Sequence, residues 1–264
     1  MPKVRVNGVQ IYYEEAGSGP AVLLIQGLGL SGRFWYRQVP ALAPYFRVIT
    51  LDNRGAGKSD KPDEPYTIRQ MAEDARALLD HLRIARAHVI GASMGGYIAQ
   101  ELAISYPERV EKLVLLCTHL GGPEYLAATQ SLWREILNVF GLTLADIYRR
   151  GIRYSVTPEF FEGQKEVVEE LVRMRLEEPQ PPHAFQRQFA AATQFDARER
   201  ASSIRAPTLV LAGAEDKVVP LKFVRQLAAT LPKAQLKIIE GAAHLLFIEK
   251  AEEVNQAILE FLRA

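Results

Sequence analysis

Short apolar runs and stretches with helical spacing alternate along most of the chain. An alternating apolar and polar stretch surrounds Asn7-Gly8, which predicts an antiparallel hairpin over residues 4–13. Short apolar runs predict buried strands at residues 21–25, 46–51, 88–90, 112–117, 207–213 and 235–239. Apolar residues at helical spacing predict helices at residues 34–42, 67–82, 97–103, 221–231 and 252–262, with Thr67 as a suitable N-cap. Strands that alternate with helices indicate an α/β architecture with a doubly wound, mostly parallel sheet of eight strands.

This alternation stops between about Gly121 and Arg200. The segment has no strand-like run, and its helical stretches are separated by glycines and prolines at residues 126–140, 144–154, 158–175 and 183–193. We therefore expect residues 121–200 to form an all-helical insertion, or cap. Residues 1–120 and 201–264 would together form the α/β core.

The composition is that of an ordinary soluble globular protein. The 264 residues carry a net charge of +1 with the signs interspersed, which gives no reason to expect a nucleic-acid or membrane-surface partner. No apolar run is long enough to span a bilayer and the first residues do not resemble a signal peptide, so a cytoplasmic protein is expected, as a monomer or homodimer. A single cysteine, Cys117, excludes an intrachain disulfide, and its apolar neighbours favour a buried thiol.

The segment Gly91-Ala92-Ser93-Met94-Gly95 lies between a predicted strand and a predicted helix. A serine can be lifted clear of a sheet only by a very sharp turn, and Gly91 and Gly95 would supply the clearance that such a turn requires. The N–H of Met94 would then be a free donor at a helix N-terminus, where negative charge is stabilised. This pattern predicts that Ser93 is a nucleophile beside half of an oxyanion site.

A serine nucleophile needs a base and a carboxylate that orients the base. Asp216 and His244 each lie in a loop that follows a predicted strand, and in a parallel sheet these loops open at the same edge as Ser93. Two alternatives remain open from the sequence: His119 as the base and Glu215 as the carboxylate. The five histidines are scattered and no Cys/His pair has ligand spacing, so neither a metal nor another cofactor is expected.

With Ser93, Asp216 and His244 in this order, the chain resembles the α/β-hydrolase family. The resemblance covers essentially the whole chain and includes four motifs, at residues 91–96, 52–59, 213–216 and 241–244. It is greatest to small bacterial carboxylesterases and to hydrolases like 3-oxoadipate enol-lactonase. The resemblance implies the α/β-hydrolase fold with an inserted helical cap and hydrolysis of carboxylic esters or lactones through an acyl-enzyme.

The resemblance also suggests an oxyanion hole. Relatives commonly carry His-Gly after the third strand, whereas this chain has Gln26-Gly27-Leu28-Gly29. The position of the family donor corresponds to the backbone N–H of Leu28, and Met94 would supply the second donor. Gln26 in place of histidine should leave both donors present and alter what supports them.

Specificity is expected to reside in the cap, whose apolar helices suggest a small-molecule ester or lactone with an apolar group. Phe34, Trp35 and Tyr97 are candidates for the substrate pocket, although core packing explains them equally well. Asp52 and Arg54, in the loop after the second buried strand, are expected to pair with each other in a structural role.

Two other functions compete with ester hydrolysis. Carbon–carbon hydrolases of ring-fission dienoates use the same three residues, and an added arginine in such relatives holds a substrate carboxylate. Arg187 and Arg153 are weak candidates for that arginine. A ligand-binding protein that keeps the fold without turnover is disfavoured by the intact set of Ser93, Asp216 and His244.

Overall fold

The structure is a computed structural model that describes residues 2–264. A single eight-stranded sheet forms its centre. The strand order is β1-β2-β4-β3-β5-β6-β7-β8. β1 and β2 form the predicted hairpin, β2 also runs antiparallel to β4, and all other neighbours are parallel. The strands are β1 (Lys3–Val6), β2 (Val9–Ala16), β3 (Ala21–Ile25), β4 (Arg47–Leu51), β5 (Ala87–Ala92), β6 (Val110–Leu116), β7 (Thr208–Gly213) and β8 (Ala234–Ile239).

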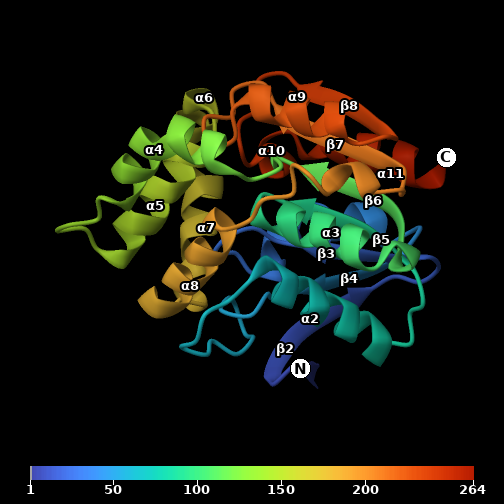
Figure 1. Cartoon of the computed structure of the whole chain (residues 1–264). Helices are drawn as coiled ribbons and strands as arrows, with labels where there is room; N and C mark the ends of the chain where they lie inside the picture. The colour runs from blue at the N-terminus through green and yellow to red at the C-terminus, as the bar shows by residue number, and fades with distance from the viewer. Residues whose placement is uncertain (1) are drawn as a thin grey trace.

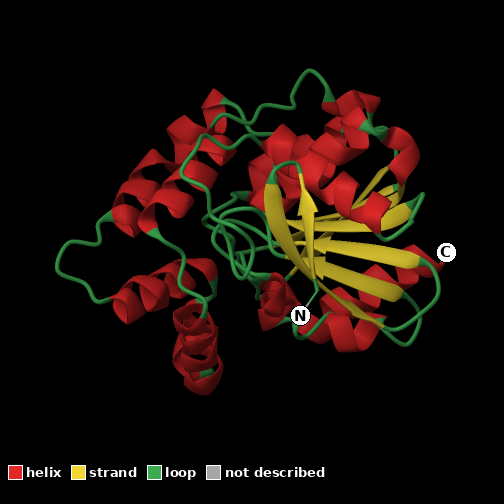
Figure 2. Cartoon of the chain, turned by 90° about the horizontal axis from the view of Figure 1, so that it is seen from below, coloured by secondary structure: helices red, strands yellow, loops and turns green. Residues whose placement is uncertain are grey.

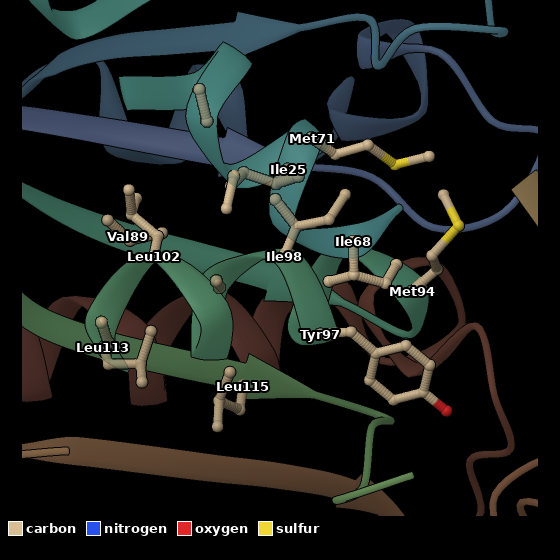
Figure 3. Close-up of a cluster of buried hydrophobic side chains, with 14 of the residues drawn as sticks. Ile25, Ile68, Met71, Val89, Met94, Tyr97, Ile98, Leu102, Leu113 and Leu115 are labelled. Atoms are coloured by element: carbon tan, nitrogen blue, oxygen red, sulfur yellow. The ribbon is translucent and has the colours of Figure 1, made fainter. Parts of the chain in front are cut away.

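Helices cover both faces of this sheet, as expected for a doubly wound fold (Figures 1 and 2). Alternate residues of a strand point to opposite faces, so Leu23 and Ile25 of β3 belong to one apolar cluster and Val22 and Leu24 to the other. The first cluster includes α2 (Ile68–His81), α3 (Met94–Ser105) and α9 (Leu221–Thr230). The second includes α1 (Val39–Leu42), α10 (Leu246–Glu249) and α11 (Ala251–Arg263). Figure 3 shows α3 packed on the sheet through Ile98 and Leu102.

Five helices lie between β6 and β7 in the sequence and form a group beside the sheet (Figure 1). We call this group the cap; it comprises α4 (Pro123–Leu137), α5 (Leu144–Ser155), α6 (Pro158–Gly163), α7 (Lys165–Glu177) and α8 (Pro182–Thr193). The two ends of the inserted segment are joined by backbone pairing. Gly122 N–H donates to Phe195 C=O (3.1 Å), Ala197 N–H donates to Leu120 C=O (2.8 Å), and Gly121 forms an isolated bridge with Asp196.

The fold class is confirmed, and most predicted elements lie within a few residues of their expected bounds. Thr67 caps α2 as expected, because its side chain accepts a hydrogen bond from the N–H of Gln70. Two predicted helices are each divided. The segment 34–42 forms a 3₁₀ turn, η1 (Gly32–Trp35), and the short α1, since Pro40 fits the first turn of a helix and not its interior. The segment 158–175 is interrupted at Gln164, whose ψ of 46° is not helical.

None of the helices in residues 2–264 has both the length and the apolar composition that crossing a membrane requires.

Candidate active site

Ser93 occupies the sharp turn between β5 and α3. Its φ of 54° lies in the left-handed region, which non-glycine residues rarely adopt. The two flanking glycines are needed for the reason predicted from the sequence. A Cβ on Gly91 would lie 2.3 Å from the backbone oxygen of Gly95, and a Cβ on Gly95 would lie 2.2 Å from that of Ile25. The turn is therefore possible only with glycine at both positions.

The loops after β7 and β8 bring Asp216 and His244 together. Oδ2 of Asp216 lies 2.8 Å from Nδ1 of His244, and both residues are buried. The other oxygen, Oδ1, accepts hydrogen bonds from the N–H groups of Val218 and Val219, each at 2.8 Å. These bonds fix the carboxylate in place. Glu215, the alternative carboxylate, is exposed.

Ser93 and His244 line the same cavity, which has a volume of about 140 Å³. The core contributes the segment Gln26–Leu28, Phe34 and Phe247, and the cap contributes mainly Trp133, Ile136, Ile152, Arg175 and Phe185. A second cavity of about 40 Å³ also reaches Ser93 and includes Leu28, Met94 and Tyr97. Ser93 thus lies between a larger and a smaller apolar space, both covered by the cap.

The two residues expected to supply the oxyanion donors line the smaller cavity together with Ser93. Met94 is the first residue of α3, so helix geometry leaves its N–H without an intrahelical partner. Leu28 belongs to a turn in which the N–H of Leu30 donates to the C=O of Gly27. This turn packs directly against the serine, because a Cβ on Gly27 would lie 3.6 Å from Oγ of Ser93.

Gln26 is fully buried beside this turn. Its Oε1 accepts a hydrogen bond from the N–H of Gly27 (3.2 Å), and its backbone C=O accepts one from Nδ2 of Asn53 (2.9 Å). Gln26 therefore braces the start of the turn from inside the protein.

The three candidate pocket residues lie in different surroundings. Phe34 lines the larger cavity and Tyr97 lines the smaller one. Trp35 lines neither of these two cavities; it is fully buried and packs against Phe247 with ring centroids 5.0 Å apart. Trp35 therefore packs in the core and does not line the pocket.

His119 is buried next to the site, but its hydrogen bonds differ from those of a catalytic base. Nδ1 accepts from the N–H of Gly121 (3.0 Å), so in the neutral ring Nε2 carries the proton and donates it to the Tyr97 hydroxyl. Burial, followed by the nearby His244, lowers the pKa of His119 to about 3. A neutral imidazole with both nitrogens engaged is a structural group.

The expected pairing of Asp52 with Arg54 is wrong. Arg54 instead forms a buried ion pair with Asp74 of α2, with Nε and Oδ2 2.6 Å apart. Asp52 accepts hydrogen bonds from the N–H groups of Gly32 (2.6 Å) and Lys58 (2.7 Å). The sequence shows that Asp52 and Arg54 are close in the chain, whereas their partners Gly32 and Asp74 come from segments that are distant in sequence.

Neither of the two arginines considered from the sequence lines the cavities at Ser93. Arg187 pairs with Asp63 (3.0 Å), and the guanidinium of Arg153 lies over the ring of Phe161. Arg175 of α7 does line the larger cavity. It occupies a helical position that gives no sequence signal, because arginines on helices usually face solvent.

Glu249 is a second residue that the sequence analysis missed. Its Oε2 accepts from the N–H of Ala243 (2.7 Å), next to His244, and its Oε1 accepts from the N–H and hydroxyl of Thr157 in the cap (2.7 and 2.9 Å). Burial raises the pKa of this carboxyl. Glu249 thus links the His244 loop to the cap.

No group of three or more His, Cys, Asp and Glu side chains within residues 2–264 has an arrangement that could hold a metal ion.

Comparison with known proteins agrees with this geometry. Residues 20–251 match the family model described as alpha/beta hydrolase fold. RutD of Caulobacter sp. (strain K31), named as a candidate carbamate hydrolase, is 34% identical over 264 residues, which cover 95% of each chain. The 2-hydroxy-6-oxo-6-phenylhexa-2,4-dienoate hydrolase of Comamonas testosteroni is 33% identical, over 96% of this chain and 91% of that protein. The enol-lactonase from Burkholderia xenovorans LB400 superimposes over 100% of both chains with a TM-score of 0.90 and 27% identity. The chain therefore belongs to the alpha/beta hydrolase fold family.

Proposed function

We propose that the protein is a serine hydrolase that cleaves carboxylic esters or lactones. The observation that carries this proposal is the 2.8 Å contact of Asp216 with Nδ1 of His244, on a cavity that also contains Ser93 in its strained turn. This arrangement leaves Nε2 of His244 as the nitrogen that can take the serine proton.

The reaction would proceed in two steps. His244 accepts the proton of Ser93 as the hydroxyl attacks the ester carbonyl, and the N–H groups of Leu28 and Met94 stabilise the negative charge on the carbonyl oxygen. His244 then returns the proton to the leaving alcohol. In the second step His244 activates a water molecule that attacks the acyl-enzyme, while Asp216 keeps the imidazole in the required tautomer.

The first test is hydrolysis of p-nitrophenyl esters from acetate to decanoate by the wild-type protein and Ser93→Ala. We expect the wild type to turn over at least the shorter esters and the variant to lose about 10⁴-fold or more in kcat/KM. The chain length at which kcat/KM is greatest will measure the space beneath the cap. Turnover that survives in Ser93→Ala, or a wild type that hydrolyses no ester and no lactone, would contradict the proposal.

Arg175 favours substrates that carry a carboxylate. Its guanidinium lies 4.0 Å from the ring centroid of Tyr148, and burial lowers its pKa to about 10, so it stays charged at neutral pH. Within residues 2–264 no carboxylate forms an ion pair with Arg175, whose side chain is half-buried. Part of the side chain faces the cavity at Ser93, where a substrate carboxylate would compensate the charge.

The guanidinium lies beside two glycines, and only at Gly29 would a side chain crowd it. A Cβ on Gly29 would lie 3.1 Å from Nη2 of Arg175, and a Cβ on Gly151 would lie 3.8 Å from Nη1. One glycine belongs to the turn beside Ser93 and the other to α5, so the charged group lies between the core and the cap. The acyl chain of a bound ester would have one end at Ser93 and its other end near Arg175.

A matched pair of esters tests this substrate class. Mono-p-nitrophenyl glutarate and p-nitrophenyl pentanoate differ only by a carboxylate in place of a terminal methyl group. We expect Arg175→Met to lower the ratio of kcat/KM for the glutarate ester to kcat/KM for the pentanoate ester by about 10- to 100-fold. This is the effect of losing one hydrogen bond to a charged group. Arg153→Met, which removes a charge from the cap outside the cavity, should leave the ratio unchanged. Equal losses for both esters would show that Arg175 only stabilises the cap.

Carbon–carbon hydrolysis of dienoates is the second candidate function. The 33% identity to the Comamonas testosteroni hydrolase and a charged arginine in the cavity both favour it. Incubation with 2-hydroxy-6-oxo-6-phenylhexa-2,4-dienoate distinguishes the two functions. Faster turnover of this dienoate than of any ester or lactone, abolished in Ser93→Ala, would establish the second function in place of the first.

A further inference from the structure

A glutamine of the cap lies against the turn that contains Leu28. Gln188 of α8 is fully buried although it belongs to the cap. Its Oε1 accepts a hydrogen bond from the N–H of Gly29 (3.0 Å), the residue after Leu28. Its Nε2 donates to the C=O of Arg54 (2.7 Å), in the loop after β4. One side chain of the cap therefore joins two loops of the core.

The orientation of this amide is determined by its partners. Oε1 also accepts from Nε2 of Gln180 (2.9 Å), and the same Nε2 donates to the C=O of Gly55 (2.8 Å). A flipped Gln188 would direct its NH₂ group at the N–H of Gly29 and at an NH₂ hydrogen of Gln180. Three donors would then face one another without an acceptor, and buried donors without a partner are costly. The flipped orientation is therefore disfavoured.

The hydrogen bond to Gly29 fixes the central peptide group of the turn, which can adopt two orientations. Residues 27–30 form a β-turn, and the φ of +71° at Gly29 is the value that a type II turn requires at its third residue. Type I and type II turns differ mainly by rotation of the central peptide group, which contains the N–H of Gly29. Gln188 accepts from this N–H and so holds the central peptide in one of its two orientations.

Leu28 is thus held from both sides. Gln26 fixes the peptide N–H before it, at Gly27, and Gln188 fixes the one after it, at Gly29. Gln26 is part of the core and always present, whereas Gln188 reaches the turn only while α8 lies on the core. The hydrogen bond between Gly29 and Gln188 therefore links the turn that contains Leu28 to the docked position of α8.

We propose that Gln188 is a positioning residue for the oxyanion hole: it aligns the N–H of Leu28 for the transition state when α8 is docked. The inference rests on the proposed serine-hydrolase function. Loss of one oxyanion donor costs about 10²- to 10³-fold in kcat. Misalignment without loss should cost less, about 10- to 100-fold, and should leave KM within about threefold, because the ground-state carbonyl depends little on this donor.

Two variants of Gln188 and one control test this proposal. Gln188→Leu removes all three hydrogen bonds at similar volume, and Gln188→Glu loses the donation to Arg54 but keeps an oxygen that can accept from Gly29. The control is Asn255→Leu, which removes a buried amide of α11 that donates to the C=O of Arg37 (2.9 Å) and accepts from Gln38 (3.1 Å); Asn255 lines neither cavity at Ser93. For each protein, kcat and KM for p-nitrophenyl butyrate are measured together with the melting temperature.

A pair of inhibitors separates alignment from stability. A trifluoromethyl ketone forms an oxyanion on Ser93, whereas the corresponding methyl ketone binds mainly as the free carbonyl. We expect the inhibition constant of the first to rise in Gln188→Leu by about the factor lost in kcat, and that of the second to stay within about threefold. Gln188→Glu should recover most of both losses, and Asn255→Leu should lower the melting temperature without either loss.

Three results would overturn the inference: Gln188→Leu with wild-type kcat, Gln188→Leu with a raised KM alone, or Asn255→Leu with the same loss of kcat. If Gln188→Leu does not fold, the decision rests on Gln188→Glu. Its kcat must then stay close to the wild-type value even where its melting temperature falls. Failure of the proposed function is a separate result, since the wild type would then show no turnover and no inhibition by the trifluoromethyl ketone.

Discussion

Asp216 and Glu215 are neighbours in the chain, yet only Asp216 contacts His244. Both oxygens of Asp216 are occupied, one by the imidazole and one by two backbone N–H groups, while Glu215 is exposed. The sequence alone does not show which of these two carboxylates contacts the histidine. The loop after β7 decides it, because it directs Asp216 toward His244 and Glu215 toward solvent.

Asp216→Asn should therefore lower kcat strongly and Glu215→Gln should not. The amide that replaces the Asp216 carboxylate presents an NH₂ group or a weaker acceptor to Nδ1 of His244, which favours the wrong imidazole tautomer. In the chymotrypsin-type triad the same change costs about 10⁴-fold. We expect a loss of about 10²- to 10⁴-fold in kcat on p-nitrophenyl butyrate, with Glu215→Gln within about twofold of wild type. Similar rates for both variants would show that Asp216 does not orient the base.

At this scale the sequence offers candidates where a residue type is tied to a local motif. Ser93 lies between glycines, and His244 and Asp216 follow predicted strands, so each could be named in advance. Arg175 and Gln188 could not, because their neighbours in the chain carry no special pattern and both become significant only where the cap meets the core. Arg54 was assigned the wrong partner for the same reason: Asp74 is distant in sequence and close in space.

At the scale of elements, the loop between β4 and α2 shows how buried polar groups hold two loops together. Asp52 accepts hydrogen bonds from Gly32, which begins η1, and from Lys58 in its own loop. Burial is the largest influence on Asp52 and raises the pKa of its carboxyl to about 6, although the two backbone donors lower it. The folded protein thus holds a proton at Asp52 more tightly than the unfolded chain does.

This difference predicts how stability changes with pH. Between about pH 4 and pH 6 the unfolded chain has lost the Asp52 proton and the folded protein still binds it, so the free energy of unfolding falls as the pH rises through this range and then levels off. The total change is about 3 kcal/mol at most. Urea unfolding of wild type and Asp52→Asn at pH 4 to 7 measures it, because the variant lacks this titration. Parallel curves for the two proteins would contradict the assignment.

Most elements were predictable because their signals are local. Continuous apolar runs mark the central strands, Asn7-Gly8 marks the hairpin, and Thr67 marks the start of α2. The interruptions at residues 36–38 and at Gln164 were missed because the apolar spacing continues across them. Hydrophobic periodicity reports which face of a segment is buried, and it does not report whether the backbone stays helical between two buried positions.

At the scale of the whole molecule, hydrogen bonds join the cap to two loops of the site. Glu249 and the bond from the N–H of Leu245 to the C=O of Ser155 (2.7 Å) connect it to the His244 loop, and Gln188 connects it to the turn at Leu28. Ion pairs of Arg33 with Glu177 (2.7 Å) and of Lys58 with Glu178 (3.3 Å) attach the end of α7 to the core. The sequence indicated an all-helical segment between β6 and β7, but its docking depends on contacts between residues far apart in the chain.

The pairing of Gly121 and Gly122 with Asp196 and Phe195 has a further consequence. The inserted segment leaves the core and returns to it at a single point, so its ends occupy adjacent positions whatever lies between them. Such a segment can be replaced by another of different length without changing any strand connection of the core. Recombination or gene synthesis that exchanges residues 122–195, with junctions at Gly121 and Asp196, would therefore replace the cap's share of the cavity lining while Phe34 and Phe247 of the core stay in place.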